Sequence, residues 1–170
     1  MFDKLGAFVG GLTLTGVVLG LIFPIAFAKP GDLTVYDQWN TLSEFEDVSE
    51  LRSMLIKNDW ADERVDLHDL DYILVLTQQL SEEFFPNVPP ALALAVISTE
   101  SGFRSWIQSP RGAEGLMQVV PKWHMERIEK YRYDENVDLY DVRLNVMVGM
   151  DYLDYILGEV HGDVAYALMW

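Results

Sequence analysis

The spacing of apolar residues is the feature that most constrains how this chain folds. Between residues 69 and 85, one set of side chains recurs every three or four positions: Leu70, Ile73, Leu74, Thr77, Leu80 and Phe84. Such spacing gives an α-helix one face that packs against a core. The alternating pattern of a half-buried strand is scarce along the rest of the chain. The sequence therefore predicts a mainly α-helical fold.

Two more helices are predicted on either side of this one. The first begins at Ser43, because Ser43 and Glu46 fit a capping box and apolar residues at helical spacing follow. The second begins after Pro89, and its apolar run ALALAVISTES ends at Gly102. Residues 29–42 show no sustained period, so we expect a linker there.

The second half of the chain predicts two further helical segments. Residues 116–131 have helical spacing on either side of Pro121. Within residues 141–160 a helix is predicted whose apolar side consists of Val146, Met150, Leu153 and Leu157. Gly162 is expected to end that helix.

Composition and charge exclude several classes of function. The 170 residues suit one compact domain with appendages. The formal net charge of −15 would repel nucleic-acid phosphates, so no nucleic-acid partner is expected. The chain has no cysteine, and His68, His124 and His161 lack the spacing of metal ligands. No metal site is therefore predicted.

Residues 5–28 contain no charged side chain. As a helix, this segment would be roughly 36 Å long, which is enough to span a bilayer. It ends in Ala26-Phe27-Ala28, which also fits the cleavage site of a signal peptide. Residues 1–28 are therefore expected to be a signal peptide or a membrane anchor, and both interpretations stay open. In both, the remainder is exported, either to the periplasm or anchored on a cell-envelope or virion membrane.

Glu100 lies near the end of the helix that begins after Pro89. On that helix it shares a face with Ala93, Val96 and Ile97, the side expected to face the core. Desolvation there raises the pKa of a carboxyl group, because it disfavours the charged form. A carboxyl that stays protonated near neutral pH can act as a general acid in glycoside cleavage. The alternative is that Glu100 faces water at a fraying helix end and has no catalytic role.

The residues around Glu100 form a dense pattern that continues to Pro121. Its members are Glu100-Ser101, Phe103, Ser109, Gly112-Ala113, Gly115-Leu116-Met117-Gln118 and Pro121. A second group follows in the last helix: Asp141, Asn145, Gly149, Tyr152 and Leu153. Together they resemble the soluble lytic transglycosylases, bacterial and phage enzymes that cut peptidoglycan. The resemblance covers roughly residues 70–170 and implies a mainly α-helical, goose-lysozyme-like (SLT) domain.

The resemblance implies a role for each matching residue. Glu100 is implied as the catalytic acid and then the base. Six residues are implied as substrate-binding: Ser109, Gly115, Met117, Gln118, Asn145 and Tyr152. Asn145, Gly149 and Tyr152 fall on one stripe of the last helix, which is expected to face the sugar cleft. The chemistry implied by the family needs no cofactor.

The family's activity is cleavage of the MurNAc–GlcNAc β-1,4 bond with a single glutamate, which gives 1,6-anhydromuramyl products. Glu114 lies near the expected cleft, so a lysozyme-type muramidase that uses water is the alternative. A second alternative is a catalytically incomplete wall-binding or assembly component of a secretion system or phage particle. The family continues into a Tyr-Asn pair that lines the cleft, and this sequence ends at Trp170, where the pair is expected.

These observations predict three segments. Residues 1–28 are the signal peptide or anchor, and residues 29–68 are an acidic linker with one amphipathic helix. Residues 69–170 are the lysozyme-like transglycosylase domain, expected to be truncated at its C-terminal end. The expected partners are peptidoglycan glycan strands, the membrane if the leader stays uncleaved, and a secretion-system or virion assembly.

Overall fold

A computed structural model describes residues 35–43 and 47–168, and its regular structure is mainly α-helical, as predicted. In chain order the helices are α1 (Val35–Leu42), α2 (Val48–Lys57), α3 (Leu67–Glu83), α4 (Pro90–Ser101), α5 (Pro121–Tyr131), α6 (Val142–Glu159) and α7 (Val164–Ala167). The predicted leader, residues 1–28, lies outside the described residues. Within the described ranges, no helix is long and apolar enough to cross a bilayer.

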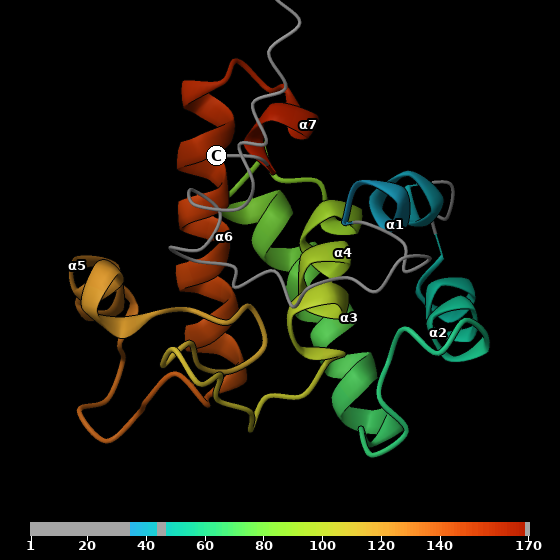
Figure 1. Ribbon diagram of the computed structural model, residues 1–170, viewed down its shortest axis with the longest axis horizontal. Coiled ribbons are helices and arrows are strands. Elements are labelled where there is room, and N and C mark those ends of the chain that lie inside the picture. Colours follow the sequence, from blue (N-terminus) through green and yellow to red (C-terminus); the bar gives the residue numbers. More distant parts are fainter. Residues whose placement is uncertain (1–34, 44–46, 169–170) are drawn as a thin grey trace, which may run out of the picture.

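Helix α4 lies at the centre of the fold. Every residue from Leu92 to Ser98 is buried, so this helix packs against neighbours on all its sides. It lies between α6 on one side and α1 on the other, and α3 packs against both α4 and α6 (Figure 1). The central position follows from the sequence, because ALALAVI offers no polar face to water.

The prediction of a linker over residues 29–42 is wrong for residues 35–42, which form α1. This helix packs along α4, and Leu42 is completely buried. Val35, Trp39 and Leu42 do fall at i, i+4 and i+7, but over only eight residues. So short a helix has little stability alone and forms because α4 covers one side of it. The division of the chain at residues 28 and 68 stays a prediction.

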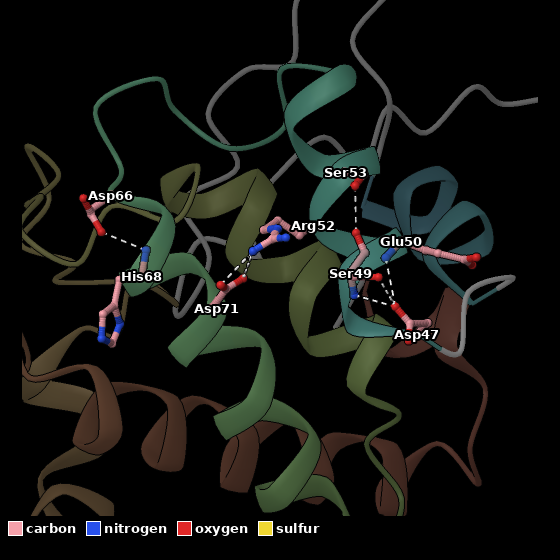
Figure 2. Close-up of polar contacts among 8 residues, drawn as sticks. All are labelled: Asp47, Ser49, Glu50, Arg52, Ser53, Asp66, His68 and Asp71. Atoms are coloured by element: carbon pink, nitrogen blue, oxygen red, sulfur yellow. Dashed lines mark hydrogen bonds and ion pairs between the residues drawn. The ribbon is translucent and has the colours of Figure 1, made fainter.

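Helix α2 begins at Val48, later than the predicted start at Ser43. Asp47 caps it, because its Oδ1 accepts hydrogen bonds from the backbone N–H groups of Ser49 (2.7 Å) and Glu50 (3.2 Å) (Figure 2). Ser43 instead lies in the turn that ends α1, where its hydroxyl donates to the Asn40 carbonyl. Arg52 of α2 pairs with Asp71 of α3 at 2.8 Å and ties the two helices together (Figure 2).

Two further predictions need correction. Phe84 was expected on the buried face of α3, but it is the C-cap of that helix and is half exposed. The chain turns there, so Phe85 enters the core in its place. Residues 116–120 are not helical, and α5 begins only at Pro121, whose missing N–H is tolerated in a first helical turn.

Helix α5 is held against α6 by a charged network around Asp151. Its carboxylate accepts hydrogen bonds from Arg127 (2.6 Å), Lys130 (2.8 Å) and Tyr131 (2.5 Å), all on α5. Burial alone would raise the pKa of Asp151, but these hydrogen bonds lower it below its ordinary value. The network therefore ties the second half of α5 to α6.

His124 is buried between the same two helices at a kink in α5. Its backbone departs from helical geometry (φ −125°, ψ 20°), and its ring packs edge-on against Tyr152, with ring centroids 5.0 Å apart. Both ring nitrogens are buried without a hydrogen-bond partner. Burial, followed by the nearby charge of Arg127, lowers the pKa of His124 to about 4. The folded protein therefore favours the neutral imidazole of His124.

This burial makes the stability of the fold depend on pH. Below pH 6.5 the unfolded chain protonates His124 while the folded chain does not, so folding stability falls as the pH drops from 6.5 towards about 4. The loss over this range is expected to be at most about 3 kcal/mol. The free energy of unfolding of His124→Leu in urea should decline less steeply over this pH range than that of the wild type. Identical declines in the wild type and His124→Leu would contradict this assignment.

Candidate active site

Glu100 lies in the last turn of the central helix α4. The helix begins at Pro90 and ends at Gly102, which adopts the left-handed conformation (φ 57°) of a C-cap. Ala93, Val96 and Ile97, on the same face as Glu100, are all buried, as is every other residue from Leu92 to Ser98. The Glu100 side chain keeps some exposed surface, but its Oε2 atom is buried without a hydrogen-bond partner.

This environment controls the protonation of Glu100. Burial raises the pKa of the carboxyl group well above its ordinary value. An ionised carboxylate with an unpartnered buried oxygen is costly, so the neutral acid is favoured. A carboxyl group whose neutral form is favoured and whose residue keeps some exposed surface suits proton donation to a bound group.

The chain after α4 forms a compact loop over residues 103–120. Gln108 pairs with Glu114 and Glu114 with Val119 in two isolated antiparallel bridges. Ser109, half buried, closes a tight turn within this loop, because its hydroxyl oxygen accepts from the Ala113 N–H at 3.0 Å. Glu114 accepts a hydrogen bond from the Gln108 side chain at 3.0 Å. Ser109 and Glu114 are thus held in place by neighbours within the loop.

Asn145 of α6 joins this loop to the helical core. Its Oδ1 accepts from the Met117 N–H (2.8 Å), and its Nδ2 donates to the carbonyls of Glu114 (2.8 Å) and Leu139 (2.7 Å). Asn145 is completely buried, so in this structure its side chain has no surface with which to contact a sugar. The geometry gives it a structural task, which is to hold the Met117 segment against α6.

Two glycines permit the close approach of loop and helix. Gly115 has a φ of 71°, and a Cβ atom there would lie 2.3 Å from Asn145 Nδ2 and 2.3 Å from the Leu139 carbonyl oxygen. A Cβ atom on Gly149 of α6 would lie 2.4 Å from Met117 Sδ. The Met117 side chain, itself fully buried, occupies the space that Gly149 leaves.

The remaining predicted residues lie around this contact. Gln118 is buried in the left-handed region (φ 48°), and its Nε2 donates to the Gly115 carbonyl at 2.9 Å. A non-glycine residue in that conformation is strained, and such strain is common at functional sites. Tyr152 lies farther along α6, half buried, with its ring next to His124 and to the guanidinium of Arg127.

The structure therefore brings together Gly115, Met117, Gln118 and Asn145 in one contact between the loop and α6. Ser109 lies in the same loop, Tyr152 lies on α6 next to α5, and Glu100 lies at the end of α4 from which the loop departs (Figure 1). Within the described part of the chain, no three acidic or histidine side chains are grouped in a way that would hold a metal ion.

Two residues near Glu100 were not predicted from the sequence. Arg104 follows the end of α4, and its Nε donates to the Ser101 carbonyl at 2.5 Å. Asp62, from the connection between α2 and α3, pairs with Arg104 at 3.4 Å. Local periodicity cannot reveal such a pair, because its members are far apart in the sequence and meet only when the chain folds.

Comparison with known proteins gives the family of this chain. Residues 81–169, just over half of the chain, match the Transglycosylase SLT domain. The chain therefore belongs to the SLT transglycosylase family, as the resemblance around Glu100 predicts.

Curated relatives match over a shorter region. The chain is 31% identical over 73 residues to proteins named soluble lytic murein transglycosylase from Escherichia coli K12 and from Escherichia coli O157:H7. The aligned region is 41% of this chain and only 11% of each relative. No solved structure gives a significant match.

The bonds of Asn145 predict how the loop responds to substitution. Asn145→Ala removes the side-chain partner of the Met117 N–H and of the Leu139 carbonyl, while the Glu114 carbonyl keeps its bond from the Val119 N–H (3.0 Å). The variant should lower the free energy of unfolding by about 2–4 kcal/mol. Asn145→Asp should cost more, because a carboxylate would face the Glu114 and Leu139 carbonyls in place of a donor. Urea unfolding measures the free energy of unfolding of both variants. Arg143→Gln, at an exposed position of α6, is the control. A loss below about 1 kcal/mol for both variants would rule out this structural role.

Proposed function

We propose that this chain is a peptidoglycan lytic transglycosylase that cleaves the MurNAc–GlcNAc β-1,4 bond with Glu100 as its single acid and base. The observation that carries the proposal is the buried, unpartnered carboxyl oxygen of Glu100 at the end of α4, with its raised pKa. Membership of the SLT family supports the substrate class, and the matched relatives are named for murein.

The proposed reaction uses one carboxyl group twice, first as an acid and then as a base. Protonated Glu100 donates its proton to the glycosidic oxygen, and the bond from that oxygen to C1 of MurNAc breaks as the N-acetyl oxygen of the same sugar assists. The Glu100 carboxylate then takes the proton of the C6 hydroxyl, and O6 forms a bond to C1. The products are a 1,6-anhydromuramyl end and a GlcNAc end with a free 4-hydroxyl, and no water is consumed. A raised pKa suits both steps, because the group must be an acid first and an effective base afterwards.

The other predicted site residues have proposed roles around this group. Ser109 and Gln118 hold the sugar, Gly115 and Met117 shape the floor of the cleft, and Tyr152 stacks against a ring. Met117, Gln118 and Asn145 are buried as whole residues, so a direct sugar contact by any of them requires the loop to move away from α6. Asn145 then acts on the substrate by holding the segment in place.

The cellular setting is also a proposal. Residues 1–28 are proposed to export the remainder as a signal peptide or to anchor it in a membrane, and residues 69–170 to form the catalytic domain. The substrate supports an extracytoplasmic location, because peptidoglycan strands lie outside the cytoplasmic membrane. A membrane-tethered form would suit a secretion system or a virion that must cross the cell wall.

The mass of the fragments released from purified peptidoglycan tests this proposal. The wild-type protein should release muropeptides that are one water lighter than hydrolysed ones, because the anhydro bond replaces the addition of water. Glu100→Gln cannot donate a proton and should lower the rate at least about a hundredfold. Glu114→Gln is the matched control, because it removes the other carboxyl near the loop without removing the proposed acid.

The outcomes separate the alternatives. Fragments of full hydrolytic mass, lost in Glu114→Gln, would show a muramidase that uses Glu114 to position water. No fragments from the wild-type protein, together with retained binding to peptidoglycan, would favour a wall-binding or assembly component.

The pKa of Glu100 also predicts the pH dependence of activity. Because the group must be protonated to act as the acid, kcat/KM should fall as the pH rises through the raised pKa of Glu100. The fall should therefore occur well above the range in which an ordinary glutamate titrates. A rate profile recorded on soluble glycan fragments checks this, and a fall near pH 4.5 would show that Glu100 is not desolvated during catalysis.

A further inference from the structure

The last turn of α4 is held by a loop that precedes the region of family similarity. The family match begins at residue 81, whereas residues 58–65 lie in the connection between α2 and α3. This loop lies against the end of α4 that carries Glu100. We call residues 58–65 the clamp loop.

Three contacts join the clamp loop to α4 on either side of Glu100. The Ser98 hydroxyl donates to the Trp60 carbonyl at 3.0 Å, and the Asp62 N–H donates to the Gly102 carbonyl at 3.0 Å. The third is the ion pair between Asp62 and Arg104, in which the guanidinium lies 3.4 Å from the carboxylate.

Arg104 also closes the helix end directly. Its Nε donates to the Ser101 carbonyl, the residue after Glu100, at 2.5 Å. The last carbonyls of a helix have no partner within the helix and must find one elsewhere. Here the Ser101 and Gly102 carbonyls are both satisfied, one by Arg104 and one by the clamp loop.

We propose that the clamp loop keeps the last turn of α4 formed, and that Asp62 and Arg104 are positioning residues for Glu100. Neither residue is assigned a contact with substrate. The inference rests on the proposed function for its catalytic consequence, but the clamp itself is a property of the fold. Helix ends fray unless their polar groups are satisfied, and a frayed last turn would let water reach the Glu100 carboxyl.

Arg64 provides a matched control. Its guanidinium binds the same Asp62 carboxylate through two hydrogen bonds of 2.8 Å. The Arg64 side chain is 62% exposed, and these two bonds join residues within the clamp loop. Arg64→Ala therefore removes one positive partner of Asp62 and leaves the contacts with α4 in place. Arg104→Ala removes the ion pair to the clamp loop and the side-chain bond to the Ser101 carbonyl, while the longer bond from the backbone N–H of residue 104 to that carbonyl (3.3 Å) stays.

Amide hydrogen exchange tests the clamp without requiring activity. In Arg104→Ala the amides of Asp62 and Gly102 should exchange at least about tenfold faster than in the wild type, while those in the middle of α6 stay unchanged. Arg64→Ala should leave all of them within about twofold of the wild type. Equal exchange in Arg104→Ala and Arg64→Ala would overturn the proposal, and this holds even if the wild-type protein cuts no peptidoglycan.

The pH profile of activity tests the positioning role. In Arg104→Ala, kcat should fall and the alkaline limb of kcat/KM should move to lower pH, because a hydrated Glu100 loses its proton more easily. The KM of Arg104→Ala should stay within about twofold of the wild-type value. Arg104→Lys should recover part of kcat, because lysine restores a positively charged hydrogen-bond donor. A raised KM with an unmoved alkaline limb would instead make Arg104 a substrate contact and overturn the proposal.

Discussion

The burial of one carboxyl group at the end of a helix is the constraint on which this structure depends. Glu100 occupies the core-facing side of α4, where an ionised group with an unpartnered oxygen is costly. The fold accepts that cost by keeping the carboxyl protonated, which is also what a proton donor to a glycosidic oxygen requires. Stability and proposed function thus impose the same condition on this residue.

The surrounding elements serve to hold that group against a defined surface. The apolar central helix α4 is enclosed on all sides, so its last turn has a fixed direction. Gly102 stops the helix, and the loop that follows returns to α6, where a single buried asparagine binds it. The site therefore combines a rigid helix end with a loop whose backbone is fixed by a few polar contacts, as catalytic sites generally require.

The sequence predicted the helices whose apolar residues recur at helical spacing over many positions. Prediction failed for elements whose structure depends on contacts between distant parts of the chain. Helices α3, α4 and α6 follow from their spacing, whereas α1 forms mainly because α4 covers it. Phe84 fits the periodic pattern of α3, but the helix ends before it and Phe85 is buried instead. The position of Glu100 was predictable from its helical face. The burial of Asn145 was not, because a stripe on a helix does not reveal which loop covers it.

Direct titration of the Glu100 carboxyl tests the central claim most directly. Carboxyl carbon chemical shifts, assigned by comparison with Glu100→Gln, report the protonation of this group in the folded protein. The account predicts that Glu100 stays protonated well above the pH range in which a solvated glutamate loses its proton. If Glu100 instead titrates within that range, its carboxyl is solvated, and neither the buried acid nor the proposed mechanism built on it stands.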